Sequence, residues 1–234
     1  MWGRVTGLAG LALTASPACA CRLALVLAID VSSSVDAAED VLQRQGLARA
    51  LADPQVAAAF FASDDPVALA IFEWSGRYNQ ARLADWTLVQ TPADLSRLSA
   101  QIAGSTRSHN DFPTAMGYAL GHAAGLLQDA PSCLFQTIDV AGDGINNEGF
   151  GPEEAYRAFP FTDVTVNGLV VNAAGFEGEV GLITYYQTEV IRGTGAFIEI
   201  ATTFEDYASA MRRKLIRELG VQMLGGTPPP AGGG

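Results

Sequence analysis

One aspartate and two serines stand at alternate positions directly after an apolar stretch. The segment reads Asp30-Val31-Ser32-Ser33-Ser34, and helical periodicity follows it. One carboxylate and two hydroxyls at this spacing bring three oxygen groups toward one point, and hard divalent cations such as Mg²⁺ prefer oxygen ligands. The alternative is that Asp30 only ends a strand and Ser34 caps the next helix. The pentapeptide alone leaves both interpretations open.

A second aspartate occupies a similar place later in the chain. Asp143 comes shortly after the apolar residues 134–140 and is followed by glycine, and Asp30 comes directly after the apolar residues 23–29. In sheets of parallel strands, ligands bind where the carboxyl ends of the strands meet, beside the point at which the strand order reverses. We therefore expect Asp30 and Asp143 to lie at one ligand-binding edge.

Strand-like and helix-like stretches alternate along the chain and must position these residues. The strand-like stretches are apolar along their whole length, which is typical of parallel strands that helices cover on both faces. Strands are expected at residues 23–29, 67–74, 86–90, 134–140, 164–171 and 196–200, and helices at 36–52, 92–103, 114–128, 181–191 and 204–219. The predicted fold class is α/β: a doubly wound, mostly parallel sheet with helices on both faces and one short edge strand, at residues 86–90.

The first twenty residues have the features of an export signal. Arg4 precedes the apolar residues 5–15, and small residues at positions 18–20 form a cleavage pattern. The expected divisions are a signal peptide at 1–20, one domain at 21–222 and a disordered Gly/Pro tail at 223–234. This predicts an exported protein, periplasmic or extracellular, with no membrane span in the mature chain. A lipoprotein acylated at Cys19 or Cys21 is the alternative, but neither cysteine has a leucine three residues before it.

The charge balance excludes two classes of partner. The chain has 14 Lys and Arg against 25 Asp and Glu, a net charge of −11. So acidic a chain lacks the clustered cations that bind nucleic acid or anionic lipid. The short basic stretch at residues 211–214 is interpreted as the solvated face of an amphipathic helix.

Common catalytic motifs are absent from the sequence. It contains no GxGxxG after the first strand, no phosphate loop with GK[ST] and no GxSxG. Its two histidines, His109 and His122, are not placed near a nucleophile by the sequence. A haloacid dehalogenase-like phosphatase also has an aspartate after its first strand, but it needs a second acid two positions on, where this chain has Ser32. We therefore predict a binding protein and not an enzyme.

The DxSxS pattern resembles the metal-ion-dependent adhesion site of von Willebrand factor type A domains. That family also needs a threonine before a middle helix and an aspartate followed by glycine after the fourth core strand. Thr114 and Asp143-Gly144 stand at these places. The resemblance covers nearly the whole mature chain and is greatest to an exported bacterial branch of the family.

The resemblance implies a magnesium site, with Mn²⁺ able to substitute. Ser32 and Ser34 would bind the metal through their hydroxyls, whereas Asp30 and Asp143 would act largely through bound waters. Thr114 would bind directly when a ligand is engaged. The position left open on the metal would take a carboxylate from an acidic residue of a partner protein. The implied function is therefore metal-dependent protein binding of the adhesion type.

Two alternatives stay open within this interpretation. Phe112-Pro113 precede Thr114 where such domains usually have glycines, so Thr106 is a rival for the threonine position. The protein could also be a metal-free scaffold in the cell envelope. That function would be favoured if the loop at residues 105–113 covered the open position on the metal.

Export also changes what the cysteines imply. Once Cys19 leaves with the signal, Cys21 and Cys133 remain as a pair in an oxidising compartment, and no spacing of the zinc-binding type is present. In the family's topology the strands that carry these two cysteines are neighbours, which implies a Cys21–Cys133 disulfide. Cys21 stands nine residues before Asp30 (21 to 30), and Cys133 stands ten before Asp143 (133 to 143). An offset of one residue between the cysteines is therefore expected.

Overall fold

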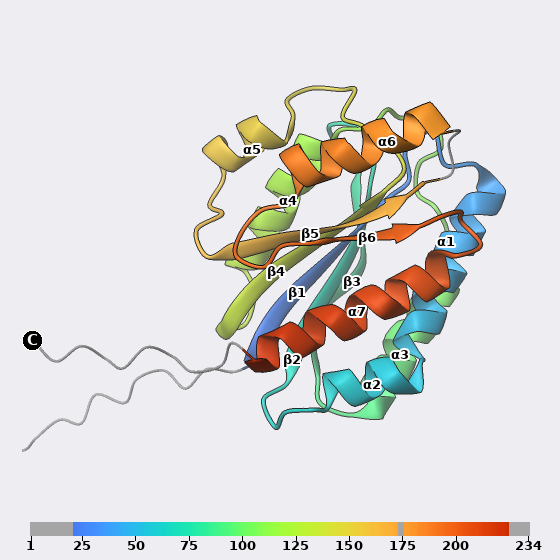
Figure 1. The fold of residues 1–234 in the computed structure, drawn as a ribbon. Helices are drawn as coiled ribbons and strands as arrows, with labels where there is room; N and C mark the ends of the chain where they lie inside the picture. Colours follow the sequence, from blue (N-terminus) through green and yellow to red (C-terminus); the bar gives the residue numbers. More distant parts are fainter. Residues whose placement is uncertain (1–20, 173–175, 225–234) are drawn as a thin grey trace, which may run out of the picture.

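A six-stranded sheet forms the centre of the fold (Figure 1). The computed structural model describes residues 21–172 and 176–224, and its strands lie in the order β3-β2-β1-β4-β5-β6. The strands are β1 (Cys21–Asp30), β2 (Val67–Trp74), β3 (Gln80–Val89), β4 (Cys133–Gly142), β5 (Val164–Val171) and β6 (Ile198–Ala201). All neighbouring strands pair in parallel except β3, which is antiparallel to β2. The predicted doubly wound, mostly parallel sheet is confirmed.

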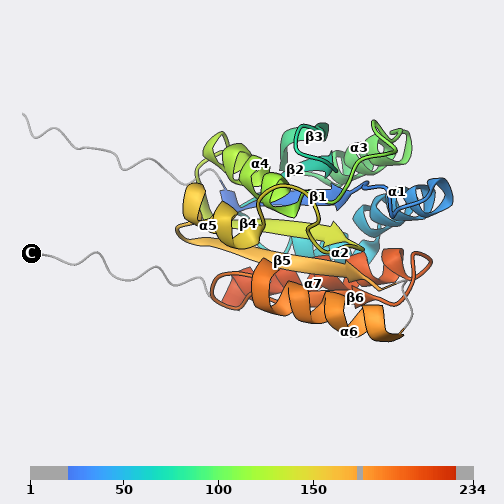
Figure 2. The same cartoon turned by 90° about the horizontal axis from the view of Figure 1, so that it is seen from above.

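Helices cover both faces of this sheet (Figure 2). They are α1 (Ala37–Leu51), α2 (Pro54–Phe60), α3 (Pro92–Ala103), α4 (Met116–Gln128), α5 (Pro152–Ala158), α6 (Phe176–Tyr185) and α7 (Tyr207–Leu224), and the π-helical turn η1 (Tyr186–Val190) follows α6. One apolar cluster packs α1, α2, α3 and α7 against the sheet, and a second packs α4, α5 and α6 against the other face. Every residue of β1 is buried between the two clusters. The most central strand therefore carries Asp30 to its carboxyl end.

The segments predicted on either side of the domain fall wholly or mostly outside the described residues. The signal peptide predicted at residues 1–20 lies there, as does most of the tail predicted at 223–234. The first two residues of that predicted tail, 223 and 224, instead complete helix α7. None of the helices within residues 21–172 and 176–224 is long and apolar enough to cross a membrane.

Several elements differ from those expected. Helix α6 begins at Phe176, five residues before the helix expected at 181–191. Helices α2 and α5 were not predicted, because Asp53-Pro54 and Gly151-Pro152 look like chain breaks, whereas proline in the first turn also suits the start of a helix. The edge strand β3 was predicted at residues 86–90, but it begins at Gln80. The first half of β3 is only partly buried, as an edge strand allows, and it contains polar residues. The sequence pattern therefore did not indicate a strand there. The short edge strand is β6, at the other side of the sheet.

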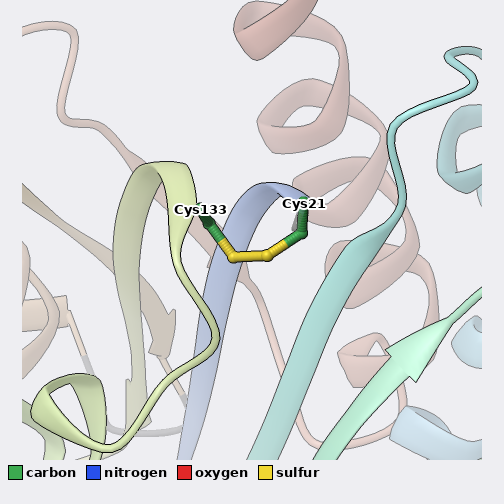
Figure 3. The surroundings of a disulfide bond; sticks show 2 residues. All are labelled: Cys21 and Cys133. Carbon is green, nitrogen blue, oxygen red and sulfur yellow. A yellow bond between two sulfur atoms is a disulfide. The ribbon is translucent and has the colours of Figure 1, made fainter. Parts of the chain in front are cut away.

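A disulfide joins β1 to β4 at the amino end of the two strands (Figure 3). Cys21 and Cys133 lie directly opposite each other, with their Cα atoms 4.5 Å apart. This is the predicted pair, but the predicted one-residue offset is wrong. The register places Ile29 opposite Ala141, so Asp143 lies one residue further along the strand direction than Asp30.

A charged cluster is buried between α7 and the sheet. Lys214 is fully buried, donates to Asp139 of β4 and lies 3.3 Å from a carboxylate oxygen of Glu218. Asn167 of β5 donates to the other oxygen of Glu218 at 2.9 Å. The interpretation of residues 211–214 as a solvated helix face is therefore wrong for Lys214. Its partner Asp139 is 75 residues away in the sequence, so helical periodicity could not reveal the pair.

Replacing Glu218 by glutamine is expected to flatten the dependence of stability on pH. Burial raises the pKa of Glu218 well above its usual value, the charge of Asp139 raises it further, and Lys214 opposes the shift. Folded Glu218 therefore keeps a proton that the unfolded chain releases, so the free energy of unfolding falls as the pH rises above about 4.5. A glutamine side chain cannot titrate, so urea denaturation at about pH 5 and pH 8 should show a smaller fall in Glu218→Gln.

The matched control is Glu153→Gln, because the Glu153 side chain is 80% exposed. This control should keep the wild-type slope of stability against pH. An equal slope in Glu218→Gln and wild type would show that the buried carboxyl is ionised in the folded protein.

Candidate metal site

Three segments bring oxygen atoms together at the carboxyl ends of β1 and β4. Ser32 and Ser34 follow β1, Asp143 follows β4, and Thr114 precedes α4. The Thr114 hydroxyl donates to Ser32 Oγ at 3.2 Å, Ser32 Oγ lies 3.1 Å from Ser34 Oγ, and Ser34 Oγ donates to Asp143 Oδ1 at 2.7 Å. We call these four residues the contact chain. They lie at the edge where the strand order reverses, between β1 and β4.

The rival threonine lies elsewhere. Thr106 is exposed on the 105–113 loop and takes no part in the contact chain, whereas Thr114 is buried. Of the two threonines, the structure brings Thr114 into contact with Ser32.

Ser34 is not the cap of the helix that follows. Helix α1 begins at Ala37, and Asp36 caps it by accepting from the backbone N–H groups of Ala38 and Glu39 at 2.7 and 2.8 Å. The Glu39 side chain in turn accepts from the Asp36 N–H at 2.7 Å. The helix start is thus satisfied without the serines, and the hydroxyl of Ser34 faces Asp143 instead.

Asp30 lies beneath the contact chain and is fully buried. Its Oδ1 accepts from the Ser32 N–H at 2.7 Å, and its Oδ2 has no hydrogen-bond partner among the residues that the structure describes. Burial, together with the nearby charge of Asp143, raises the pKa of Asp30 to about 8. Burial also raises the pKa of Asp143. Two carboxyl groups in a site that disfavours their negative charge would be stabilised by a cation.

The donor set fits a hard divalent cation. In the described part of the chain, no three His, Cys, Asp or Glu side chains lie close enough together to hold a metal ion. A cation at this edge would therefore depend on the hydroxyls of Ser32, Ser34 and Thr114 as well as on two carboxylates. Oxygen donors of this kind suit Mg²⁺ or Mn²⁺. The unpartnered Oδ2 of Asp30 is a buried polar atom of the kind that a bound cation or its waters would satisfy.

Tyr186 also reaches this edge of the sheet, although no sequence pattern pointed to it. Its hydroxyl and the Oδ2 of Asp30 both lie against Gly142, where an added Cβ would come within 2.8 Å of each. Its ring lies over Gly168 of β5, where an added Cβ would come within 2.6 Å. Tyr186 begins the π-helical turn η1, a form often found at functional sites. The only available signal was glycine within two strands, which often marks a close approach.

Asn147 was a second residue missed from the sequence. Its Oδ1 accepts from the Thr114 N–H at 2.9 Å, and its own N–H donates to the Thr114 carbonyl at 2.9 Å. Asn147 therefore joins the segment that carries Thr114 to the loop that carries Asp143. The contact spans 33 residues, so no local spacing could indicate it.

Comparison with known protein families assigns the chain to one of them. A family model described as "Protein of unknown function (DUF1194)" matches residues 20–223. The chain belongs to the DUF1194 family. No curated protein matches the sequence of this DUF1194 member.

Solved structures show that the DUF1194 chain has the von Willebrand factor type A fold. A von Willebrand factor type A structure from Catenulispora acidiphila is 16% identical, with a TM-score of 0.60, over 86% of this chain and 43% of the other. The proximal thread matrix protein 1 of the mussel byssus, solved with a zinc-occupied adhesion-site motif, is 16% identical, with a TM-score of 0.58, over 86% of this chain and 48% of the other. The DUF1194 chain thus spans less than half the length of both.

BatB from Bacteroides thetaiotaomicron matches over almost its whole length. It is 16% identical, with a TM-score of 0.55, and the match covers 85% of the DUF1194 chain and 99% of BatB. The resemblance to the von Willebrand factor type A family is confirmed at the level of the fold.

Proposed function

We propose that this DUF1194 chain is an exported protein-binding domain that holds Mg²⁺ and captures a carboxylate of a partner protein. Ser32, Ser34 and Thr114 would provide hydroxyl ligands, and Asp30 and Asp143 would provide negative charge through bound waters. Bound Mg²⁺, or Mn²⁺ in its place, would supply a positive charge with one position for the partner's acidic side chain.

The contact chain carries this proposal. Its four oxygen-bearing side chains come from three separate segments, and each lies within 3.2 Å of the next, from Thr114 to Asp143. Below them, Asp30 keeps one buried carboxylate oxygen without a partner among the described residues. The zinc-occupied motif in the byssal protein supports a divalent metal on this fold.

The alternatives have less support. A phosphatase of the haloacid dehalogenase type needs a carboxylate where this chain has the buried hydroxyl of Ser32. A 105–113 loop that covered the open position on the metal would favour a metal-free scaffold, but Ser34 is exposed and Asp143 is partly exposed.

We also propose that the domain does not catalyse a reaction. His109 packs edge-on against Phe112, and His122 packs against Phe72.

Calorimetric titration of the purified protein with Mg²⁺ tests the site. Replacing Asp30 by alanine is expected to weaken binding by about 10- to 100-fold, because a cation there loses the central buried carboxylate. Thr114→Ala should weaken binding as well. Thr106→Ala is the matched control and should bind as wild type does. If Asp30→Ala binds Mg²⁺ as tightly as wild type, the site lies elsewhere.

The partner needs a separate measurement. Immobilised wild type should retain one or more envelope proteins in Mg²⁺ and release them in chelator. Asp30→Ala should retain none of these proteins under either condition. Retention that is equal for both proteins, with and without Mg²⁺, would favour the metal-free scaffold.

A further inference from the structure

The 105–113 loop, between α3 and α4, is tied to the segment that carries Ser32 and Ser34. Arg107 donates most of the hydrogen bonds between the two segments. Its guanidinium donates to the carbonyl oxygens of Val31 and Val35 at 2.6 Å each, and to that of Ser32 at 2.8 Å. A further bond at 2.6 Å, to the carbonyl of His109, holds the loop around the arginine itself. One side chain thus holds three carbonyl groups of the backbone that positions the contact chain.

A backbone hydrogen bond also joins the loop to the segment that carries Ser32 and Ser34. The N–H of Ser33 donates to the carbonyl of Phe112 at 2.8 Å. The two segments are therefore joined at two points along the loop, by the Arg107 side chain and by the Phe112 backbone.

Buried charges hold the loop from its other side. Glu73 of β2 is buried, accepts from the Ser108 N–H at 2.7 Å and is paired with Arg44 of α1. Arg44 also donates to the Ser105 hydroxyl at 2.8 Å. The residues on both sides of Arg107 are thus anchored to the core, which gives its guanidinium a fixed place from which to hold the site.

We propose that Arg107 is a positioning residue for the metal site, holding the backbone of residues 31–35 so that the Ser32 and Ser34 hydroxyls converge. The proposal rests on the proposed function for its effect on Mg²⁺ binding. It goes beyond that function, because Arg107 lies in a different segment and, among the described residues, its hydrogen bonds go to backbone carbonyls.

The charge of Arg107 and its positioning role predict opposite effects on cation binding. A positive charge close to Asp30 and Asp143 repels a cation, so removing that charge would by itself strengthen Mg²⁺ binding. Removing the hydrogen bonds would instead free the serine backbone and weaken binding. A loss of affinity in Arg107→Ala is therefore a signature of positioning.

Two measurements on the full chain test the proposal. Calorimetry should show Mg²⁺ binding about 10-fold weaker or more in Arg107→Ala, the range for residues that orient metal ligands. Amide hydrogen exchange in chelator should show faster exchange limited to residues 31–35 and to the 105–113 loop that Arg107 joins to them. Arg107→Lys keeps the charge but cannot span three carbonyls, so it should bind no more tightly than Arg107→Ala. Arg97→Ala removes an equal charge from a side chain that is 63% exposed and should change neither measurement.

The outcomes separate this proposal from the proposed function. If wild type binds no Mg²⁺, the proposed function fails, and hydrogen exchange alone decides whether Arg107 holds residues 31–35. If Arg107→Ala leaves exchange and affinity unchanged, or binds Mg²⁺ more tightly, Arg107 is not a positioning residue. Faster exchange throughout the domain in both Arg107→Ala and Arg107→Lys would show general destabilisation and would also overturn the proposal.

Discussion

Replacing Cys21 and Cys133 together by alanine is expected to lower the free energy of unfolding by about 4 to 5 kcal/mol. The disulfide joins residues 112 apart in the sequence, so it removes much conformational freedom from the unfolded chain. It also fixes the first residue of the central strand to β4, where the strand would otherwise fray. Urea denaturation of the variant and wild type measures the difference.

Wild type in a reducing agent is the control for this prediction. Reduced wild type should unfold near the midpoint of the double variant, because both lack the covalent link. Equal midpoints for oxidised wild type and the variant would contradict the expected stabilisation. Two free thiols in peptides from unreduced protein isolated from its native compartment would show that the bond does not form.

Replacing Lys214 by methionine is expected to lower the free energy of unfolding by about 3 to 5 kcal/mol. Methionine fills similar space but leaves the carboxylate of Asp139 buried without its cation, and Asp139 is only 3% exposed. Breaking one side of a buried ion pair costs more than removing both charges, because the remaining charge has lost its water and its partner.

Two variants test the cause of that loss. Lys214→Met combined with Asp139→Asn should recover most of the lost stability, since the second change removes the unpaired charge. Arg213→Met lies next to Lys214, but its side chain is 44% exposed, so it should cost under about 1 kcal/mol. If the double variant is as unstable as Lys214→Met, lost packing accounts for the effect.

Local sequence pattern was enough to find the residues of the candidate site that lie at the strand ends. Asp30 ends β1, whose apolar run is evident in the sequence, Ser32 and Ser34 follow it, and Asp143 follows β4. Parallel strands bring their carboxyl ends to one edge, so the general place of the site followed from the fold class. Thr114 needed the family resemblance, because one threonine before a helix carries little information by itself.

The residues that escaped prediction act over long sequence distances. Arg107 bonds to carbonyls up to 76 residues away, and Tyr186 approaches Asp30 across two strands. Such contacts leave no periodicity, because each depends on the packing of whole elements. The cysteine register was wrong for a related reason. Asp30 and Asp143 were assumed to lie at one level, but the loop after β4 begins one residue later.

The central position of β1 has a mechanical consequence. This strand carries the candidate site at one end and the disulfide at the other, with parallel neighbours on both sides. A tensile load applied between the candidate site and Cys21 would run along the strand axis. Because both points of load lie on β1, its covalent backbone would carry the force, and the disulfide would pass part of it to β4, which leads to Asp143 at the same edge.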